Sequence, residues 1–376
     1  MTVATENCNA LPTGYQLEEY RILSIIGQGD FGITYLAQDT KKNYQVALKE
    51  YFPKNLAIRE NSNNVVQPKI QQDEKNFIWG LERFFKEGQI LTNFQHPNIV
   101  RVLRSFKVHN TAYIVMEYEQ GQNLSNVLKE KGTISEAEII SILPPLLSGL
   151  HAIHEAGFLH QNIKPDSIYL RDKNHTPVLL DFGAARYAIG RLHRSVEPIV
   201  TAGYAPFEQY QIKGPQGPWT DIYALGAVLY RAVSGQTPIE VLKRIDAITR
   251  QKEEDPLSPA IQIGHHHYSE NLLQGIDWAL QIAEEDRPQT VQQWAKTLLP
   301  KSSKPLKFYH SIVSFDRPKK RRFNRWVFAS VILTIMGFNV GYVFYTEQRI
   351  AHLQQQKIFL LKLLTVFKQN QIEFQK

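Results

Sequence analysis

Residues 158–183, FLHQNIKPDSIYLRDKNHTPVLLDFG, constrain the fold of this chain more than any other stretch. They contain two short apolar runs, 168–170 and 178–180, which are separated by a polar turn and therefore predict a β-hairpin. Polar residues flank both runs: a histidine and a lysine precede the first run, and an aspartate follows the second. A hairpin with such side chains at its base could bind phosphate groups and metal ions.

A glycine-rich turn lies nearer the amino terminus. Residues 22–26 and 33–37 read as two strands, and the segment that joins them holds Gly27, Gly29 and Gly32. Glycines at this spacing let backbone N–H groups approach phosphate oxygens, because no Cβ stands in the way. In dinucleotide-binding folds a helix follows such a turn, whereas here a strand follows. The pattern favours a phosphate-binding hairpin over a dinucleotide site, with an ordinary glycine-rich hairpin as the alternative.

A strand that ends in a lysine and a long helix follow the glycine-rich turn. Lys49 ends the strand-like segment 46–49, and an amphipathic helix is predicted over residues 73–92. The apolar positions that predict this helix are Phe77, Leu81, Phe84, Ile90 and Leu91. Two glutamates, Glu82 and Glu87, lie on this predicted helix. Residues 51–72 are polar and predict an inserted loop, partly strand-like at 65–66.

Together these motifs resemble the protein kinase family. That family shows the order His-Arg-Asp-x-Lys-Pro-x-Asn followed by Asp-Phe-Gly. The positions that this chain keeps are His160, Lys164, Pro165, Asp181, Phe182 and Gly183. The likeness covers residues 20–299 and is closest to bacterial membrane Ser/Thr kinases. It implies an α+β fold of two lobes, a β-rich N-lobe and a helical C-lobe.

The resemblance also implies ligands and roles. The nucleotide would be ATP with Mg²⁺, and the acceptor a Ser or Thr hydroxyl of a protein. The residues that match the family's nucleotide-binding positions are Gly27, Gly29, Gly32, Lys49, Glu87, Met116, Glu117 and Tyr118. The last three end the strand-like segment 112–118, which would enter the hinge between the lobes and meet the adenine. The resemblance also implies an acidic partner for Lys49 on the predicted helix, with Glu87 as the candidate and Glu82 as the runner-up. The catalytic positions are Asn162, Lys164 and Asp181, and the metal-binding positions are Asp181 and Ser167.

Three residues of the catalytic loop depart from the family pattern. Gln161 replaces the family's Arg, Asn162 replaces the Asp that accepts the substrate's hydroxyl proton, and Ser167 replaces the Asn that holds a second magnesium. Asn162 cannot take a proton, and a serine reaches less far than an asparagine. Thr34, which stands where the family usually has Val beside the adenine, is a small change. The residues that would bind the nucleotide, the glycines and Lys49, are called the nucleotide side here, and the catalytic loop from Gln161 to Ser167 is called the transfer side. The sequence therefore predicts an intact nucleotide side and an altered transfer side.

The C-terminal part of the domain is expected to be helical. Apolar patterning predicts helices over 139–154 and 219–230. From the resemblance, Glu208 should form a structural ion pair with Arg287, and Asp221 should anchor the backbone of the catalytic loop. His265, His266 and His267 are adjacent in the sequence, so they cannot share one helix face as metal ligands and are expected in a solvated loop.

A basic segment followed by an apolar one predicts a membrane anchor. The formal net charge is +7, and residues 296–325 hold ten Lys or Arg against one acidic residue. Residues 326–345 carry no charge over twenty positions, roughly 30 Å of helix at about 1.5 Å per residue. We therefore expect a basic linker at 300–325, a single transmembrane helix at 326–345 and a short amphipathic tail at 346–376. A nucleic-acid arm and a buried helix are the less favoured alternatives, and no nucleic-acid partner is expected.

The charge distribution also predicts the orientation. Basic residues precede the apolar segment, and few follow it, so the kinase-like domain should face the cytoplasm and the tail should lie on the far side. Residues 1–19 are polar and predict a disordered tail without a signal-peptide core. The chain has one cysteine, Cys8, which excludes an intramolecular disulfide framework and fits a reducing compartment.

Two functions remain open at this stage. The first is a membrane-anchored, ATP-binding signalling protein whose phosphoryl transfer is impaired, since Asn162 and Ser167 replace the usual base and metal-binding residue. The second is an active Ser/Thr kinase that moves the γ-phosphate of ATP to a protein substrate. Both predict ATP, a protein partner or substrate and a membrane, and they differ in the rate of transfer.

Overall fold

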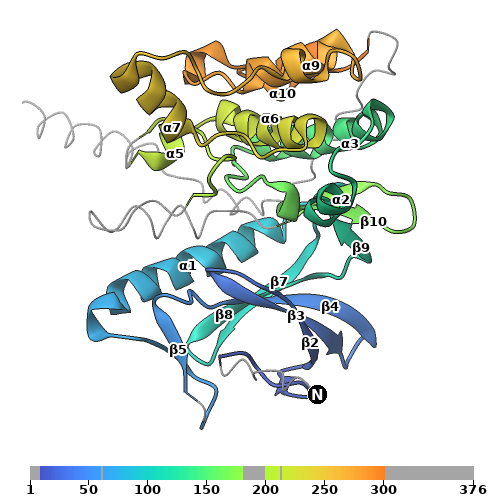
Figure 1. The fold of residues 1–376 in the computed structure, drawn as a ribbon. Coiled ribbons are helices and arrows are strands. Elements are labelled where there is room, and N and C mark those ends of the chain that lie inside the picture. Colours follow the sequence, from blue (N-terminus) through green and yellow to red (C-terminus); the bar gives the residue numbers. More distant parts are fainter. Residues whose placement is uncertain (1–8, 61, 181–199, 212–213, 301–376) are drawn as a thin grey trace, which may run out of the picture. The chain divides into compact units, whose positions relative to one another are not determined.

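The computed structural model describes residues 9–60, 62–180, 200–211 and 214–300, and these residues form two lobes (Figure 1). Cys8, Asp181, Phe182, Gly183 and Ser195 lie outside the described residues, as do the predicted linker, transmembrane helix and tail. The two-lobed α+β prediction is confirmed: strands dominate the first lobe and helices the second (Figure 1).

The described part of the N-lobe is built on a six-stranded antiparallel sheet with the order β1-β2-β3-β4-β8-β7. Its strands are β1 (Gln16–Leu17), β2 (Tyr20–Gln28), β3 (Gly32–Asp39), β4 (Tyr44–Tyr51), β7 (Val102–Val108) and β8 (Thr111–Glu117). The predicted glycine-rich hairpin is confirmed as the connection of β2 and β3. Strand alternation gives the sheet a buried face that includes Tyr35, Leu48 and Tyr113, each fully buried.

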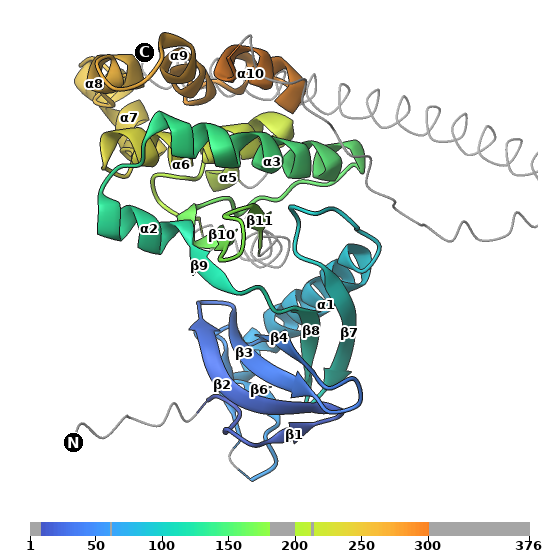
Figure 2. The ribbon, with the colours of Figure 1, turned by 90° about the vertical axis from the view of Figure 1, so that its right-hand side faces the viewer.

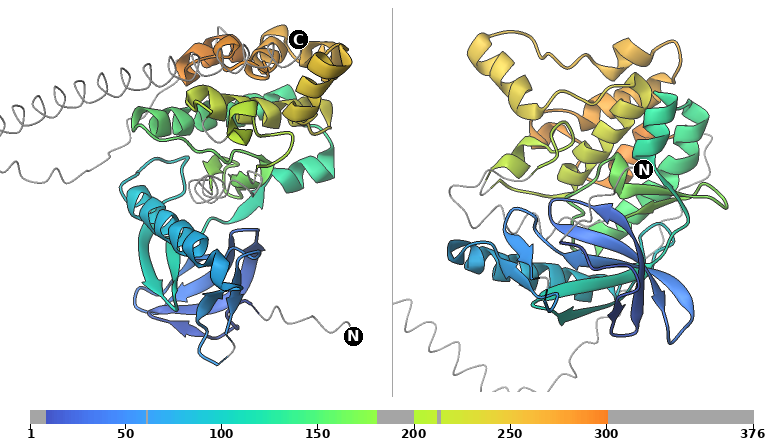
Figure 3. Two further views of the ribbon diagram at one scale, coloured as in Figure 1. Left: turned by 90° about the vertical axis from the view of Figure 1, so that its left-hand side faces the viewer. Right: turned by 60° about the horizontal axis from the view of Figure 1, so that its bottom comes forward.

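The predicted amphipathic helix is also confirmed. It is α1 (Glu74–Leu91), which a short 3₁₀ turn (Gln71–Asp73) precedes, and it packs against β7 and β8. Figure 3 shows α1 running along the sheet. Gly88 allows the close approach, because a Cβ at this position would lie 2.8 Å from the Ile114 side chain and 2.9 Å from that of Ser105.

The inserted segment is more ordered than the sequence predicted. The strand-like part predicted at 65–66 is found as β6 (Val66–Pro68), which pairs with β5 (Ala57–Arg59) in a second hairpin where a loop was expected. The reason is a buried polar network: Arg59 Nη2 donates to Glu50 Oε2 at 2.6 Å, and both side chains are almost completely buried. The buried polar residues of this segment form hydrogen bonds with one another, so its polar composition does not imply that it is exposed to solvent.

The predicted disordered tail at 1–19 is wrong for its second half. Leu11 and Leu17 are each 2% exposed and belong to the core of the N-lobe, and β1 pairs with β2. Leu11 N also donates to Tyr35 Oη at 3.0 Å. These few apolar residues are isolated in a polar stretch, and only the tertiary contact makes them part of the fold.

A small sheet and a set of helices make up the rest. The order of the small sheet is β11-β10-β9, and Figure 2 shows it between the N-lobe and the helices. Its strands are β9 (Gly121–Asn123), β10 (Ile168–Arg171) and β11 (Pro177–Leu179), and the last two form the predicted hairpin. The helices are α2 (Leu124–Lys131), α3 (Glu136–Glu155), α5 (Phe207–Tyr210), α6 (Pro218–Ser234), α7 (Val241–Asp246), α8 (Ala260–Gly264), α9 (Glu270–Ala279) and α10 (Val291–Leu298). Short 3₁₀ turns lie at Pro165–Ser167 and Glu284–Asp286, and a π-helical segment lies at Ala247–Gln251.

The predicted helices of this lobe are confirmed as α3 and α6. Ser135 begins α3 with a capping box in which its hydroxyl accepts from Glu138 N. Within the described ranges, α3 is the one helix long and apolar enough to cross a bilayer, but its residues Leu143, Leu147 and Leu150 are fully buried in the core. It is a core helix, and it does not bear on the membrane prediction for residues 326–345.

Candidate functional site

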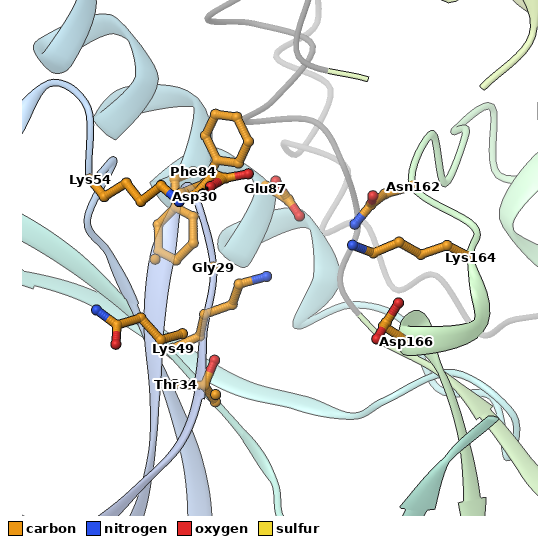
Figure 4. A pocket seen from close by; sticks show the side chains of 14 residues that line it. Gly29, Asp30, Thr34, Lys49, Lys54, Phe84, Glu87, Asn162, Lys164 and Asp166 are labelled. Atoms are coloured by element: carbon orange, nitrogen blue, oxygen red, sulfur yellow. Dashed lines mark ion pairs between the residues drawn. The ribbon is translucent and has the colours of Figure 1, made fainter. Parts of the chain in front are cut away.

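A cavity of about 770 Å³ lies where the glycine-rich turn, α1 and the catalytic loop face one another (Figure 4). The residues that line it are Gly27, Gln28, Gly29, Asp30, Phe31, Gly32, Thr34, Lys49, Lys54, Phe84, Glu87, Asn162, Lys164 and Asp166. The list joins residues from three distant parts of the sequence. Seven of them were predicted as nucleotide or catalytic residues: the three glycines, Lys49, Glu87, Asn162 and Lys164.

The three glycines of the turn have different reasons to be glycine. A Cβ on Gly32 would lie 2.3 Å from the carbonyl oxygen of Glu50, so the pairing of β3 with β4 requires this residue. A Cβ on Gly29 would meet no atom within 4 Å, and one on Gly27 would make only ordinary contact with Thr34. Packing within the described residues does not explain these two. Their missing side chains leave space in the cavity, which fits a loop that receives a ligand.

Lys49 and Glu87 both line the cavity, and each comes from a regular element of the N-lobe. Lys49 lies on β4, where it pairs with Thr34 of β3, and Glu87 lies on α1. Figure 4 shows both side chains pointing into the cavity. Glu82, the runner-up, is excluded as a cavity residue because its carboxylate binds Lys107 Nζ at 2.5 Å on the surface of the N-lobe. The choice of Glu87 agrees with the geometry.

The predicted hinge residues lie at the end of β8, and none of the three lines the cavity. Met116 is 8% exposed and pairs with Ala47 of β4, so it packs within the sheet. The N–H group of Glu117 is engaged with the carbonyl of Arg101 at 3.0 Å. A role for Met116, Glu117 and Tyr118 in adenine binding therefore stays a prediction.

The segment after the hinge is held to the C-lobe by a bidentate ion pair. Arg171, at the end of β10, donates from Nε and Nη2 to the two carboxylate oxygens of Glu119 at 2.7 and 2.6 Å. A further bond runs from Asp172 N to the carbonyl of Gln120 at 3.0 Å. The chain that leaves the N-lobe is thus fixed to the C-lobe almost at once.

Asp221 anchors the catalytic loop as predicted. Its Oδ2 accepts from His160 N and from His154 Nε2, both at 2.8 Å, and its Oδ1 accepts from Gln161 N at 2.7 Å. Burial alone would raise the pKa of Asp221, but the hydrogen bond and charge of His154 and the other donors lower it, and the net pKa lies below its ordinary value. The carboxylate stays ionised and holds two consecutive backbone N–H groups of the loop.

His160 connects the loop to the strand that leads to Asp181. Its Nδ1 accepts from Asn162 N at 3.3 Å, and its Nε2 donates to the carbonyl of Leu180 at 2.9 Å. A second bond joins the same parts, from Leu180 N to the carbonyl of Ser167 at 2.8 Å. The backbone on both sides of the cavity's transfer end is therefore fixed by hydrogen bonds.

The transfer end of the cavity holds an amide, an ammonium and a carboxylate. Figure 4 shows Asn162, Lys164 and Asp166 facing the glycine-rich turn and Lys49. Ser167 is not with them. It is 1% exposed, and its hydroxyl accepts from Lys164 N at 3.0 Å and donates to Lys164 O at 2.9 Å. Metal binding by Ser167 stays a prediction, and it would require the side chain to leave this turn.

Among its described residues, the cavity contains few oxygen ligands for a magnesium ion. The hard Mg²⁺ ion prefers oxygen ligands, usually one or two carboxylates together with phosphate oxygens. Within residues 9–60, 62–180, 200–211 and 214–300 no three His, Cys, Asp or Glu side chains form a metal cluster. The cavity does offer the oxygens of Asn162 and Asp166, and Asp181 lies outside the described residues. This donor set fits an ion that arrives with a nucleotide better than a resident metal.

Gln161 points away from the cavity and binds the segment that precedes α6. Its Nε2 donates to Gln216 Oε1 at 2.9 Å, and its carbonyl accepts from Gln209 Nε2 at 3.1 Å. Gln161, which stands where the family has an Arg, is thus part of a network of neutral amide side chains.

The predicted pair of Glu208 and Arg287 is confirmed and is structural. Arg287 Nη1 lies 2.8 Å from Glu208 Oε1, and both side chains are at most 1% exposed. Thr220, in the first turn of α6, donates its hydroxyl to the same carboxylate at 2.9 Å.

Sequence reasoning did not select six of the residues that line the cavity: Gln28, Asp30, Phe31, Lys54, Phe84 and Asp166. Asp30 and Asp166 stand inside motifs that were recognised, at positions where the motif leaves the residue type open. Lys54 carried a weaker signal. It lies five residues after Lys49, and only the reversal of the chain at Pro53 brings it back to the glycine-rich turn.

Comparison with known proteins gives a consistent result. The family described as protein kinase domain matches residues 20–299. The serine/threonine-protein kinase PknA of a Nostoc species is 33% identical over 232 residues, which cover 59% of this chain and 38% of that protein. Serine/threonine-protein kinase D of a Synechocystis species is 32% identical over 232 residues, with 60% of this chain and 42% of that protein covered. The chain spans about two fifths of the length of these relatives.

Solved structures agree. The apo form of PpkA-294 matches with a TM-score of 0.70 and 39% identity, over 77% of this chain and 100% of that one. The kinase domain of PknI from Mycobacterium tuberculosis has a TM-score of 0.56 at 20% identity, over 77% of this chain and 98% of that one, which supports the fold alone.

Proposed function

Because the chain belongs to the protein kinase family and carries a Ser/Thr protein kinase domain, we propose that it binds ATP with Mg²⁺ and acts in signalling as a membrane-anchored protein with slow phosphoryl transfer. The observation that carries this proposal is the composition of one cavity. The glycine-rich turn, Lys49 and Glu87 line the same space as Asn162, which stands at the position of the family's base.

The nucleotide side has the parts that phosphate binding requires. Gly27 and Gly29 have no side chain, so a phosphate can approach the backbone of the turn closely, and Lys49 supplies a positive charge. Glu87 on the rigid helix α1 is in a position to orient the lysine. When Mg²⁺ is bound, it would neutralise part of the phosphate charge, with Asp181, Asn162 and Asp166 as the available oxygen ligands.

The transfer side lacks a group that takes a proton at residue 162. In transfer, the substrate oxygen bonds to the γ-phosphorus, the bond from that phosphorus to the bridging oxygen breaks and ADP leaves, and the hydroxyl proton passes to a phosphate oxygen or to water, since the Asn162 amide cannot accept it. General-base catalysis is worth about 10²–10⁴ in rate. Phosphoryl transfer has a loose transition state in which the base acts late and mostly orients the hydroxyl, so an amide performs part of this task. A loss near the lower end of that range follows.

One observation favours the alternative of an active kinase. Asp166 brings a carboxylate into the cavity four residues after Asn162, on the same loop. A carboxylate at this place could accept the hydroxyl proton in place of the missing aspartate. The alternative predicts that Asp166→Asn removes most of the remaining transfer, whereas impaired catalysis predicts little change.

The proposal is tested with the full-length chain in detergent micelles. ATP at about 100 times its Kd should stabilise the domain by about 2.7 kcal/mol, and omission of magnesium should reduce this effect. Transfer to a generic Ser/Thr protein substrate should be far below the roughly 1–100 per second of ordinary kinases. Lys49→Ala is the control that should abolish the stabilisation. Absence of any ATP effect would contradict the nucleotide-binding proposal, and an ordinary rate that Lys49→Ala abolishes would establish the alternative.

Membrane anchoring is supported by the apolar residues 326–345 and the basic residues before them. A reporter fused before Met1 should respond as cytoplasmic, and one fused after Lys376 as non-cytoplasmic. Both reporters on the same side would refute a single span. The protein substrate or signalling partner would then be cytoplasmic.

A further inference from the structure

Asp30 is an unexpected residue for a phosphate-binding turn. It lies between Gly29 and Gly32, and it lines the cavity next to the backbone groups that would meet the nucleotide's phosphates. A carboxylate at this place repels a triphosphate, because like charges at short range disfavour binding. If the cavity takes ATP, another residue has to neutralise Asp30.

Lys54 is that residue. Its Nζ lies 2.5 Å from Asp30 Oδ1, and Figure 4 shows the pair at the edge of the cavity that both residues line. The lysine side chain is 56% exposed and the aspartate 47%. An ion pair this exposed contributes little to stability, so its place in the cavity is the informative property.

The backbone holds the two residues together independently of the ion pair. Lys54 N donates to the carbonyl of Asp30 at 3.0 Å, and Phe52 N donates to that of Phe31 at 3.0 Å. The tip of the glycine-rich turn is therefore tied to the start of the inserted segment. Loss of either charge would leave these two backbone bonds in place.

The inserted segment itself is rigid where it carries Lys54. Leu56 N and Ala57 N both donate to the carbonyl of Pro53 at 2.9 Å, which closes a turn around the lysine. The hairpin β5–β6 that follows is fixed by the buried Arg59, whose Nε and Nη1 donate to the carbonyls of Asn9 and Asn64 at 2.8 Å each. The position of the Lys54 backbone thus depends on the fold of the N-lobe and not on a ligand.

We propose that Lys54 is a second cation, beside Lys49, that binds the phosphate groups of the nucleotide. Asp30 holds the Lys54 ammonium at the cavity, and the ammonium in turn neutralises Asp30. An ammonium has three donors, so Lys54 can keep a bond to Asp30 and offer another to a phosphate oxygen. This inference rests on the proposed ATP binding, and it gives the inserted segment 51–72 a function in that site. It predicts that phosphate affinity depends on the charge of both residues.

The test measures the Kd of the full-length protein for MgATP, MgADP and adenosine by titration calorimetry. Lys54→Met should weaken MgATP about tenfold, because it removes a cation and leaves Asp30 facing the phosphates. Adenosine, which has no phosphate, should bind within about twofold of the wild type. Lys54→Arg should keep most of the affinity. Lys69→Met is the matched control, since Lys69 is an exposed lysine of the same inserted segment that does not line the cavity.

Asp30→Asn completes a double-mutant cycle. Alone it should tighten MgATP a few-fold, and combined with Lys54→Met it should recover most of the loss, because the repulsive carboxylate is gone. Equal weakening of adenosine and MgATP by Lys54→Met would show a merely structural residue and overturn the inference. So would a Lys54→Met variant that matches Lys69→Met, or strictly additive effects in the cycle. If the wild type binds none of the three ligands, ATP binding itself fails and this inference fails with it.

Discussion

The two sides of the cavity are built in different ways. The nucleotide side places Lys49 and Glu87 on a strand and a helix of the N-lobe, whereas the transfer side places Asn162, Lys164 and Asp166 on a loop. Around residue 162 the loop is held by bonds that do not involve the Asn162 side chain: Asp221 accepts from the backbone N–H groups of His160 and Gln161, and His160 Nε2 donates to the carbonyl of Leu180. The scaffold of the transfer side is therefore separable from its chemistry. A change at residue 162 alters the reaction and leaves the loop standing.

The largest effect on stability is expected at His96, because this residue connects the segment after α1 to α3 of the C-lobe. It follows α1, its Nε2 binds Ser148 Oγ of α3 at 3.2 Å, and its Nδ1 accepts from Asn98 N at 3.1 Å. Burial lowers the pKa of His96 to about 4. Protonation would place a hydrogen on Nδ1 against the N–H of Asn98, so the folded protein disfavours the charged form.

A histidine with a lowered folded pKa makes stability depend on pH with a definite sign. Between pH 6.5 and 4 the unfolded chain binds the proton and the folded chain does not, so acidification through this window favours unfolding. At 1.36 kcal/mol per pKa unit, His96 should cost about 3 kcal/mol of unfolding free energy between pH 7 and pH 4. Urea unfolding of wild type and His96→Gln at both pH values measures the difference, and exposed His175→Gln is the control. Equal pH slopes in all three would disprove the assignment.

Asn162→Asp is the sharpest test of the contrast between scaffold and chemistry. Because the loop is already in place, a carboxylate at residue 162 should raise the rate of transfer about 10²-fold without a change in ATP affinity. Addition of Ser167→Asn should give a double variant faster than the product of the single gains, if each residue needs the other. Asn126→Asp, an exposed residue of α2, controls for the added charge. No gain in rate would mean that the two sides are not independent.

The smallest effect is expected for activation through Gln161: phosphorylation of the activation segment should hardly change the transfer rate by way of this residue. In many kinases an arginine at this position binds a phosphate on the activation segment, but a neutral amide cannot make that charged bidentate contact. Here Gln161 instead binds Gln216. Phosphorylation of Ser195 or Thr201 should change the transfer rate less than about twofold through this loop. A strong activation that Gln161→Ala abolishes would contradict this prediction, as measured by rate assays on the phosphorylated protein.

Sequence reasoning succeeded where a motif fixes both residue type and spacing. The glycine-rich hairpin and the helix that carries Glu87 were predicted correctly because strand pattern and helix periodicity place them, and the Asp221 anchor was predicted from the family resemblance. The nucleotide-binding roles of Lys49 and Glu87 stay predictions. It failed where placement depends on tertiary contacts. Arg59 reads as a solvated residue in a polar loop, and only Glu50 on a neighbouring strand makes it a buried one.

The residues of the cavity show the same limit. Asp30 and Asp166 occupy motif positions that the pattern leaves open, so the pattern gave no reason to select them. The hydrogen bonds of Ser167 could not be predicted from the sequence either, because a serine is short enough to bond back to Lys164 within its own turn. Metal binding by Ser167 stays a prediction.

The ion pair of Arg171 with Glu119 fixes the chain that connects the lobes. From residue 119 onward the chain is fastened to the C-lobe, by this pair, by the bond to Gln120 and by the pairing of β9 with β10. Up to Glu117 it belongs to the sheet of the N-lobe. The other crossing between the lobes is fastened as well: Val100 N donates to the carbonyl of Leu179 at 3.0 Å, and Arg171 Nη1 donates to that of Pro97 at 2.8 Å. Arg171 therefore ties both crossings of the chain to the C-lobe, so one guanidinium joins the two strands of chain that connect the lobes.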